Sequence, residues 1–109
     1  MNPSEPNVII AFSTIDTEKE AKKIARILVE SHLVACVNII PKAISIYEWK
    51  KKICEEEEFL LVLKTTVDRL EELKVTLAEI HPYEVPELTA VPVADGLPDY
   101  LLWVAQVTT

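Results

Sequence analysis

Glycine, aromatic residues and cysteine are all scarce in this 109-residue chain. Gly96 is the only glycine, which nearly excludes a loop that cradles phosphate groups, because such loops need several glycines close together. Aromatic residues make up only 6% of the chain, so few rings are available for nucleic-acid bases to stack on. Cys36 and Cys54 are too few for a disulfide scaffold and lack CxxC spacing. We therefore expect reduced thiols and a cytoplasmic protein.

Positive charge, long apolar runs and catalytic motifs are lacking as well. The formal net charge is −7, which repels nucleic acid. The apolar run Val8 to Phe12 is far shorter than the roughly 20 residues of a membrane span, and no basic residue precedes it as in a secretory signal. GxGxxG, GxSxG and HExxH patterns are absent. The sequence thus favours a binding role over catalysis, with neither nucleic acid nor a membrane as partner.

What the chain does have is enough apolar sequence for a single domain over residues 1–109. Half of its residues are hydrophobic, and a chain of this length buries about two-thirds of its surface on folding. Apolar, β-branched runs predict strands, and three- and four-residue spacing predicts helices. The expected strands are 8–12, 34–49, 58–65 and 88–93, and the expected helices are 17–32, 67–80 and 100–107.

Four local signals place the ends and bends of these elements. Thr17 with Glu20 is a capping box at a helix start. Pro41 predicts a bulge or bend in the long second strand, and Pro82 ends the second helix. Pro92 argues for an edge position of the last strand.

The element order predicts an α+β fold: a ferredoxin-like βαββαβ sandwich with an extra C-terminal helix. Two helices cover one face of such a sheet. The unbroken apolar run Phe59 to Leu63 shows that both faces are apolar, so something must cover the second face. Because the chain has no spare helix for that task, we expect another subunit to cover it.

A charged hairpin is predicted between the second and third strands. Lys50 to Lys52 are followed by Glu55 to Glu57, and a turn near Ile53 and Cys54 would set the lysines opposite the glutamates. We expect this arm to be exposed to solvent.

The segment His81 to Glu87, HPYEVPE, is the densest cluster of unusual residues. It lies between a helix and a strand, where binding residues often gather. One interpretation is a rigid connector whose His81 caps the helix. The other is a corner that binds a ligand or a metal ion, and the residues alone do not decide between them.

Two interpretations are open for each of three further residues. Lys64 follows five apolar residues, so its ammonium group either emerges into a cleft or extends to solvent at the sheet edge. Cys36 lies in an apolar run and fits a small buried side chain better than a nucleophile. Trp49 is expected to anchor an interface or the core.

Several segments in the same order resemble the CutA family: Leu33 to Ile39, the Tyr47/Trp49 stretch, Glu58 with Leu63-Lys64-Thr65, His81 to Glu87, and Gly96 with Tyr100, Leu101 and Trp103. The resemblance implies a ferredoxin-like homotrimer, similar to nitrogen-regulatory signalling trimers, with sites in the clefts between subunits. It also implies a role in divalent-cation tolerance, with Cu²⁺ or another divalent cation as a ligand that is not required for folding. His81 matches the histidine of the family's HPY motif, whereas a preceding histidine and a cysteine of a bacterial relative's copper site fall on Ile80 and Phe12. The cleft candidates are Cys36, Trp49, Glu58, Lys64, Tyr83 and Glu87.

Three hypotheses about function follow. The first is a metal-linked binding protein in which His81, with Glu87 or Tyr83, offers ligands that a neighbouring subunit completes. The second is a trimeric sensor or scaffold that binds a small anion near Lys64 and His81. The third is an enzyme with Cys36 as nucleophile and His81 as base.

Overall fold

A computed structural model describes residues 6–109 of the chain. A 3₁₀ turn, Val67–Arg69, leads into the second helix. Every expected helix and strand is present, with end points that differ by a few residues except in the hairpin. The elements are β1 (Val8–Ile15), α1 (Glu18–Glu30), β2 (Cys36–Trp49), β3 (Lys52–Thr66), α2 (Leu70–Ile80), β4 (Thr89–Pro92) and α3 (Pro98–Val107).

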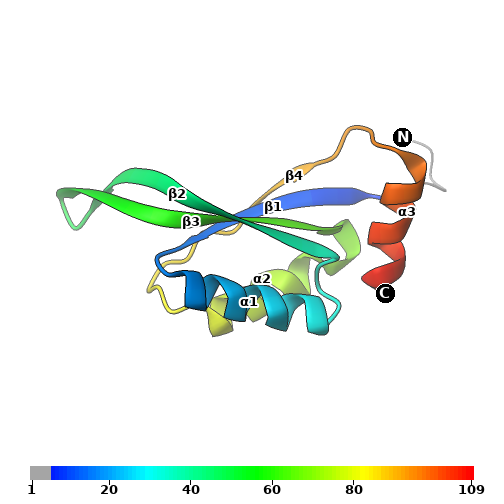
Figure 1. Cartoon of the computed structure of the whole chain (residues 1–109), viewed down its shortest axis with the longest axis horizontal. Helices are drawn as coiled ribbons and strands as arrows, with labels where there is room; N and C mark the ends of the chain where they lie inside the picture. The colour runs from blue at the N-terminus through cyan, green and yellow to red at the C-terminus, as the bar shows by residue number, and fades with distance from the viewer. Residues whose placement is uncertain (1–5) are drawn as a thin grey trace.

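The four strands form one antiparallel sheet in the order β2-β3-β1-β4. Helices α1 and α2 lie side by side on one face of the sheet, and the β2–β3 hairpin extends well beyond them (Figure 1). This confirms the predicted α+β fold, with its fourth strand at an edge and its additional C-terminal helix. Pro92 lies in that edge strand, where a missing N–H group costs no ladder hydrogen bond inside the sheet.

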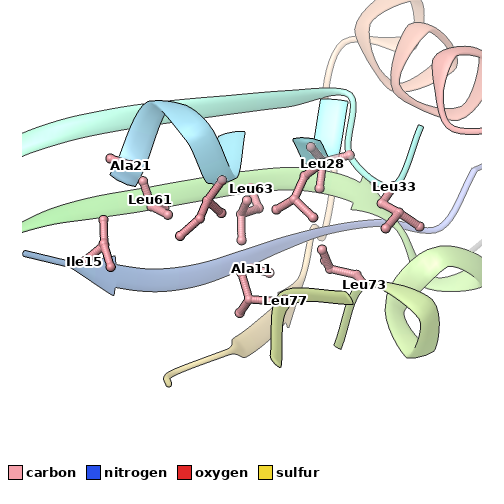
Figure 2. Close-up of a cluster of buried hydrophobic side chains, with 11 residues drawn as sticks. Ala11, Ile15, Ala21, Leu28, Leu33, Leu61, Leu63, Leu73 and Leu77 are labelled. Carbon is pink, nitrogen blue, oxygen red and sulfur yellow. The ribbon is translucent and has the colours of Figure 1, made fainter. Parts of the chain in front are cut away.

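The core lies between the sheet and the two helices. Alternate residues of β1 and β3, such as Ala11 and Leu63, point into it because Cβ atoms alternate along a strand. Leu28 of α1 and Leu77 of α2 close it from the other side (Figure 2). The Thr17 hydroxyl accepts a hydrogen bond from the Glu20 N–H group at 3.2 Å, so α1 begins where the sequence predicted.

The second face of the sheet is only partly covered by the chain itself. Val104 of α3 is fully buried against Val8 and Ala35, which corrects the expectation that no helix remained for this face. The rest of the face is largely apolar and partly exposed, with Asn38 and Lys64 among its polar residues. We call it the open face, and its residues are Ile10, Phe12, Ile40, Leu60, Val62 and Val91.

The position of the hairpin turn differs from the prediction. Lys50 and Lys51 form the turn, with φ values of 50° and 66°, and Trp49 pairs directly with Lys52. Positive φ at both central residues suits a two-residue hairpin turn, because its twist matches that of the strands. A turn near Ile53 and Cys54 is therefore wrong, and β3 begins at Lys52 instead of Glu58.

This register also changes what the glutamates of the hairpin face. Glu55, Glu56 and Glu57 pair with Ile46, Ser45 and Ile44, so the predicted cross-strand pairs of lysine and glutamate do not form. A bulge between Ile40 and Ala43 shifts the register of β2, as Pro41 predicted. The three glutamates are exposed, as expected for a solvated arm.

In the part of the chain that the structure describes, no helix has both the length and the apolar character that crossing a bilayer requires.

Candidate functional site

A cleft of about 410 Å³ lies between the β2–β3 hairpin and the connection from α2 to β4. We call it the hairpin cleft. Tyr47 and Cys54 pair directly across the hairpin, so their side chains lie on the same side of it, and Trp49 shares that side two residues further along β2. The lining residues are Asp16, Tyr47, Trp49, Cys54, Glu56, Tyr83, Glu84 and Val85.

Tyr83 connects this cleft to the body of the sheet. Its hydroxyl donates a 2.7 Å hydrogen bond to Oε2 of Glu58, a carboxylate that is only 5% exposed. Burial of the phenol, followed by its hydrogen bond to Glu58, holds the pKa of Tyr83 far above its ordinary value of 10. The pair is therefore a neutral donor on a buried acceptor, which fixes the ring at the rim of the cleft.

We expect replacement of Tyr83 by phenylalanine to lower the free energy of unfolding by about 1–3 kcal/mol at neutral pH, because the buried Glu58 carboxylate loses a donor. Above pH 10 the unfolded chain releases the Tyr83 proton while the folded chain keeps it, so the stability of the natural protein falls as pH rises. The variant should show a smaller fall. Urea unfolding at pH 7 and pH 11 measures both effects.

The control for this comparison is Tyr100→Phe, which removes an exposed phenol from α3. An equal alkaline loss of stability in the natural protein and in Tyr83→Phe would contradict the predicted role of the Tyr83–Glu58 hydrogen bond.

His81 is buried, with 6% of its surface exposed, and both of its ring nitrogens have partners. Nδ1 accepts a hydrogen bond from the Tyr83 N–H group at 3.1 Å, so Nε2 carries the ring hydrogen and donates it to the Thr14 carbonyl oxygen at 2.8 Å. The His81 backbone N–H group also ends α2 by donating to Leu77. The ring therefore fastens the 81–88 connection to β1.

The pKa of Tyr47 reflects the negative charge in the cleft. A hydrogen bond to the Glu56 carboxylate is the main cause that raises the pKa of Tyr47 to about 12, and burial and the nearby negative charges add to it. Glu56 stands on β3 beside the Tyr47–Cys54 pair. The mouth of the cleft is therefore acidic and keeps its phenols protonated.

Lys64 lies in a second pocket, of about 270 Å³, on the sheet face opposite α1 and α2. It pairs with Cys36 on one side and Ile10 on the other, and its ammonium group donates to Oδ1 of Asn38. Cys36 is half-buried beside them, with Sγ 4.0 Å from the same Asn38 oxygen. Asp95 and Tyr100 also line this pocket.

The structure separates the predicted candidates into two groups. Trp49, Glu58 and Tyr83 gather at the hairpin cleft, and His81 lies next to it, where its ring accepts a hydrogen bond from the Tyr83 N–H group. Lys64 and Cys36 lie about 13 Å along the sheet from the site of His81. Lys64 pairs with Ile10 of β1, whereas His81 bonds to Thr14, four residues further along the same strand.

Glu87 belongs to neither group. It is exposed and accepts a 2.9 Å hydrogen bond from the hydroxyl of Thr89. In one subunit Glu87 and His81 thus have different hydrogen-bond partners, and Cys36 does not lie beside His81 as the enzyme hypothesis needs.

Of the eight residues that line the cleft, sequence reasoning named Trp49 and Tyr83 as site candidates and missed the other six, which are Asp16, Tyr47, Cys54, Glu56, Glu84 and Val85. Cys54 and Glu56 were missed because the turn was placed near Cys54, which hid their pairing with Tyr47 and Ser45. The alternation of Tyr47 and Trp49 was the usable signal, since residues two apart share one side of a strand.

A family model described as "CutA1 divalent ion tolerance protein" matches residues 9–107. Protein CutA of Mus musculus is 51% identical over 102 residues, which cover 94% of this chain and 58% of that protein. The chain thus spans little more than half the length of this relative. Divalent-cation tolerance protein CutA of Thermus thermophilus is 42% identical over 99 residues, which cover 91% of this chain and 96% of that protein.

The fold of the subunit is shared with solved structures. The structure described as "PII-like protein CutA from Nostoc sp. PCC 7120 in apo form" superposes with a TM-score of 0.86 and 39% identity, over 93% of this chain and 97% of that one. Two other relatives are named for different compartments. They are a chloroplastic Protein CutA of Arabidopsis thaliana, 38% identical over 92% of this chain and 55% of its own length, and a periplasmic CutA from Archaeoglobus fulgidus, with a TM-score of 0.90 and 31% identity over 94% of this chain and 99% of its own.

Proposed function

Because the chain belongs to the CutA1 divalent ion tolerance protein family, we propose that it is a non-catalytic binding protein that takes part in the tolerance of divalent cations. The observation that carries this proposal is the acidic hairpin cleft, where Asp16, Glu56 and Glu84 supply carboxylates and Cys54 a thiol. Carboxylates suit hard divalent ions, and thiolates suit softer ones. The chain's net charge of −7 adds a field that draws cations toward the surface.

The proposal includes a homotrimer. The open face contains apolar side chains that a soluble monomer seldom leaves uncovered, and Ile40 and Val91 are 46% and 48% exposed there. β2 and β4 are the two edges of the sheet, so both also present unpaired backbone groups. A second and third copy of the chain would cover the face and the edges together.

We propose that copper binds to the assembled oligomer and not to a single subunit. Within residues 6–109 of one subunit, no three His, Cys, Asp or Glu side chains are placed to hold one metal ion. His81 would supply one nitrogen only after giving up its hydrogen bond to Thr14 or to Tyr83. One subunit therefore does not fit a complete copper site, and ligands from a neighbouring subunit would be needed.

We expect Cu(II) titrated calorimetrically into the native oligomer at neutral pH to show one saturable event of moderate affinity, because binding must break a hydrogen bond of His81. Replacing His81 with alanine should abolish the event. His32 provides a matched control: it is exposed, it contacts the carbonyl oxygen of Val107, and His32→Ala should bind as the natural protein does.

Because His81→Ala also removes two hydrogen bonds inside the subunit, its fold and oligomeric mass have to be verified by circular dichroism and light scattering. Equal binding by a folded His81→Ala oligomer and the natural protein would move the metal from His81 to the carboxylates of the hairpin cleft.

A small-molecule sensor is the second candidate function. It is favoured by the pocket of about 270 Å³ at the half-buried Lys64, whose ammonium group has an amide for its partner and whose lining is mainly apolar apart from Asp95 and Tyr100. A relative with the same fold is described as PII-like. Protection of the amides around Lys64 and Gly96 from hydrogen exchange by a small carboxylate, without metal, would distinguish this function from cation binding.

We place the protein in the cytoplasm. The two free cysteines, Cys36 and Cys54, support this proposal, since both remain unbridged and half-buried in the subunit.

A further inference from the structure

We propose that the hairpin cleft binds a linear alkylamine with two or more ammonium groups, that is, a diamine or polyamine. This inference deepens the proposed function, because it depends on the cleft being a binding site and names the chemistry of the cation. It is carried by the rings of the cleft, by the placement of its carboxylates and by a lysine of the chain itself.

Three aromatic rings border the cleft. Tyr47 and Trp49 lie on one side of the hairpin, and Tyr83 reaches the cleft from the 81–88 connection. The face of such a ring carries partial negative charge and attracts organic cations, tryptophan most strongly. The methylene groups of an alkylamine would in addition pack on the same rings, which a hydrated metal ion does not do.

An alkylammonium group of the chain already occupies this neighbourhood. Nζ of Lys50 lies 5.9 Å from the centre of the Trp49 ring, within the range of a cation–π contact. The lysine side chain is a butylammonium ion in all but its attachment to the backbone. Trp49 is therefore accessible to an alkylammonium group, and Lys50 would compete with a free amine for it.

The carboxylates of the cleft are distributed around it instead of converging. Asp16 follows β1, Glu56 belongs to β3 and Glu84 lies in the 81–88 connection. In the described part of the chain they form no cluster of three that could share one metal ion. Separated negative charges suit a ligand whose positive charges are also separated, and primary ammonium groups can donate a hydrogen bond to each carboxylate.

The composition of the lining supports the same charge. The residues that line the cleft include three carboxylates and no lysine or arginine. The volume of about 410 Å³ falls in the range of small-molecule sites.

The test is calorimetric titration of spermidine into the native protein at low ionic strength. Trp49→Ala removes the main ring and Glu56→Gln removes one charge without changing its shape, so each should weaken spermidine binding by about tenfold. Lys50→Gln should tighten it by about twofold to fivefold, because the competing ammonium group is gone. Lys42→Gln, in the bulge of β2, is the matched control for loss of one positive charge and should bind as the natural protein does.

Two other cations complete the design. Tetramethylammonium has no N–H donor and Mg²⁺ has no methylene groups, so both should bind at least tenfold more weakly than spermidine. Equal affinity for spermidine and Mg²⁺, or unchanged spermidine binding in Trp49→Ala and Glu56→Gln, would show only general screening of negative charge and overturn the inference. If the natural protein does not bind spermidine but does show a Cu(II) binding event that depends on His81, this inference alone is refuted and the proposed function still holds.

Discussion

Replacing Val62 with aspartate is expected to convert the proposed trimer into monomers. Val62 lies at the centre of the open face, between Phe12 of β1 and Asn38 of β2. In a single subunit this position is partly exposed, so the new carboxylate can reach water and the fold should survive. In the proposed trimer it would lie among apolar side chains of the neighbouring subunits with only Asn38 and Lys64 as polar neighbours, which costs several kcal/mol at each of three copies.

Light scattering on a sizing column measures this effect. The natural protein should return about three times the subunit mass of 12.3 kDa, and Val62→Asp the mass of one subunit. The matched control is Val75→Asp, on the outer surface of α2, where the side chain is 59% exposed. A trimer of Val62→Asp, or a natural protein that is monomeric at micromolar concentration, would show that the open face is not the subunit interface.

Replacing Leu61 with alanine should lower the free energy of unfolding by about 2–5 kcal/mol. Leu61 of β3 is fully buried in the core between the sheet and the helices, where its loss leaves a cavity that the surrounding side chains fill only in part (Figure 2). Urea unfolding at one fixed subunit concentration measures the change, since unfolding of a trimer depends on concentration.

Leu97 supplies the control for Leu61. It precedes α3 and is 79% exposed in the subunit, so Leu97→Ala should change the stability by no more than about 0.5 kcal/mol. Similar losses in the two variants would mean that the layer between the sheet and helices α1 and α2 is not the main stabilising core.

Local chemistry explains why so many elements were predictable. The Thr17 cap, the end of α2 before Pro82 and the bulge near Pro41 each depend on a few neighbouring residues. The turn was not predictable in this way, because Lys50 and Lys51 are unusual residues for positive φ. The turn lies at these two lysines because the register of the whole β2–β3 pairing places it there. The packing of β3 in the sheet helps to fix that register.

The candidate site was predictable only in pieces. The 81–87 motif pointed to His81 and Tyr83, and the sequence left open whether His81 binds a ligand or caps a helix. The structure gives both ring nitrogens protein partners, which a sequence pattern could not show because Thr14 is 67 residues away. The hairpin cleft, likewise, assembles Asp16, Tyr47 and Glu84 from distant segments.

The sequence by itself determined the order of helices and strands, the acidic charge and the excess of apolar residues over what one sheet face can bury. These properties depend on composition and on short periodic patterns, which are readable within a few residues. Only the tertiary structure decided that α3 covers one end of the second face, that Lys64 and His81 lie in different places, and that carboxylates surround aromatic rings in one cleft. These depend on strand register and on long-range packing, where a shift of one residue moves every side chain to the other face.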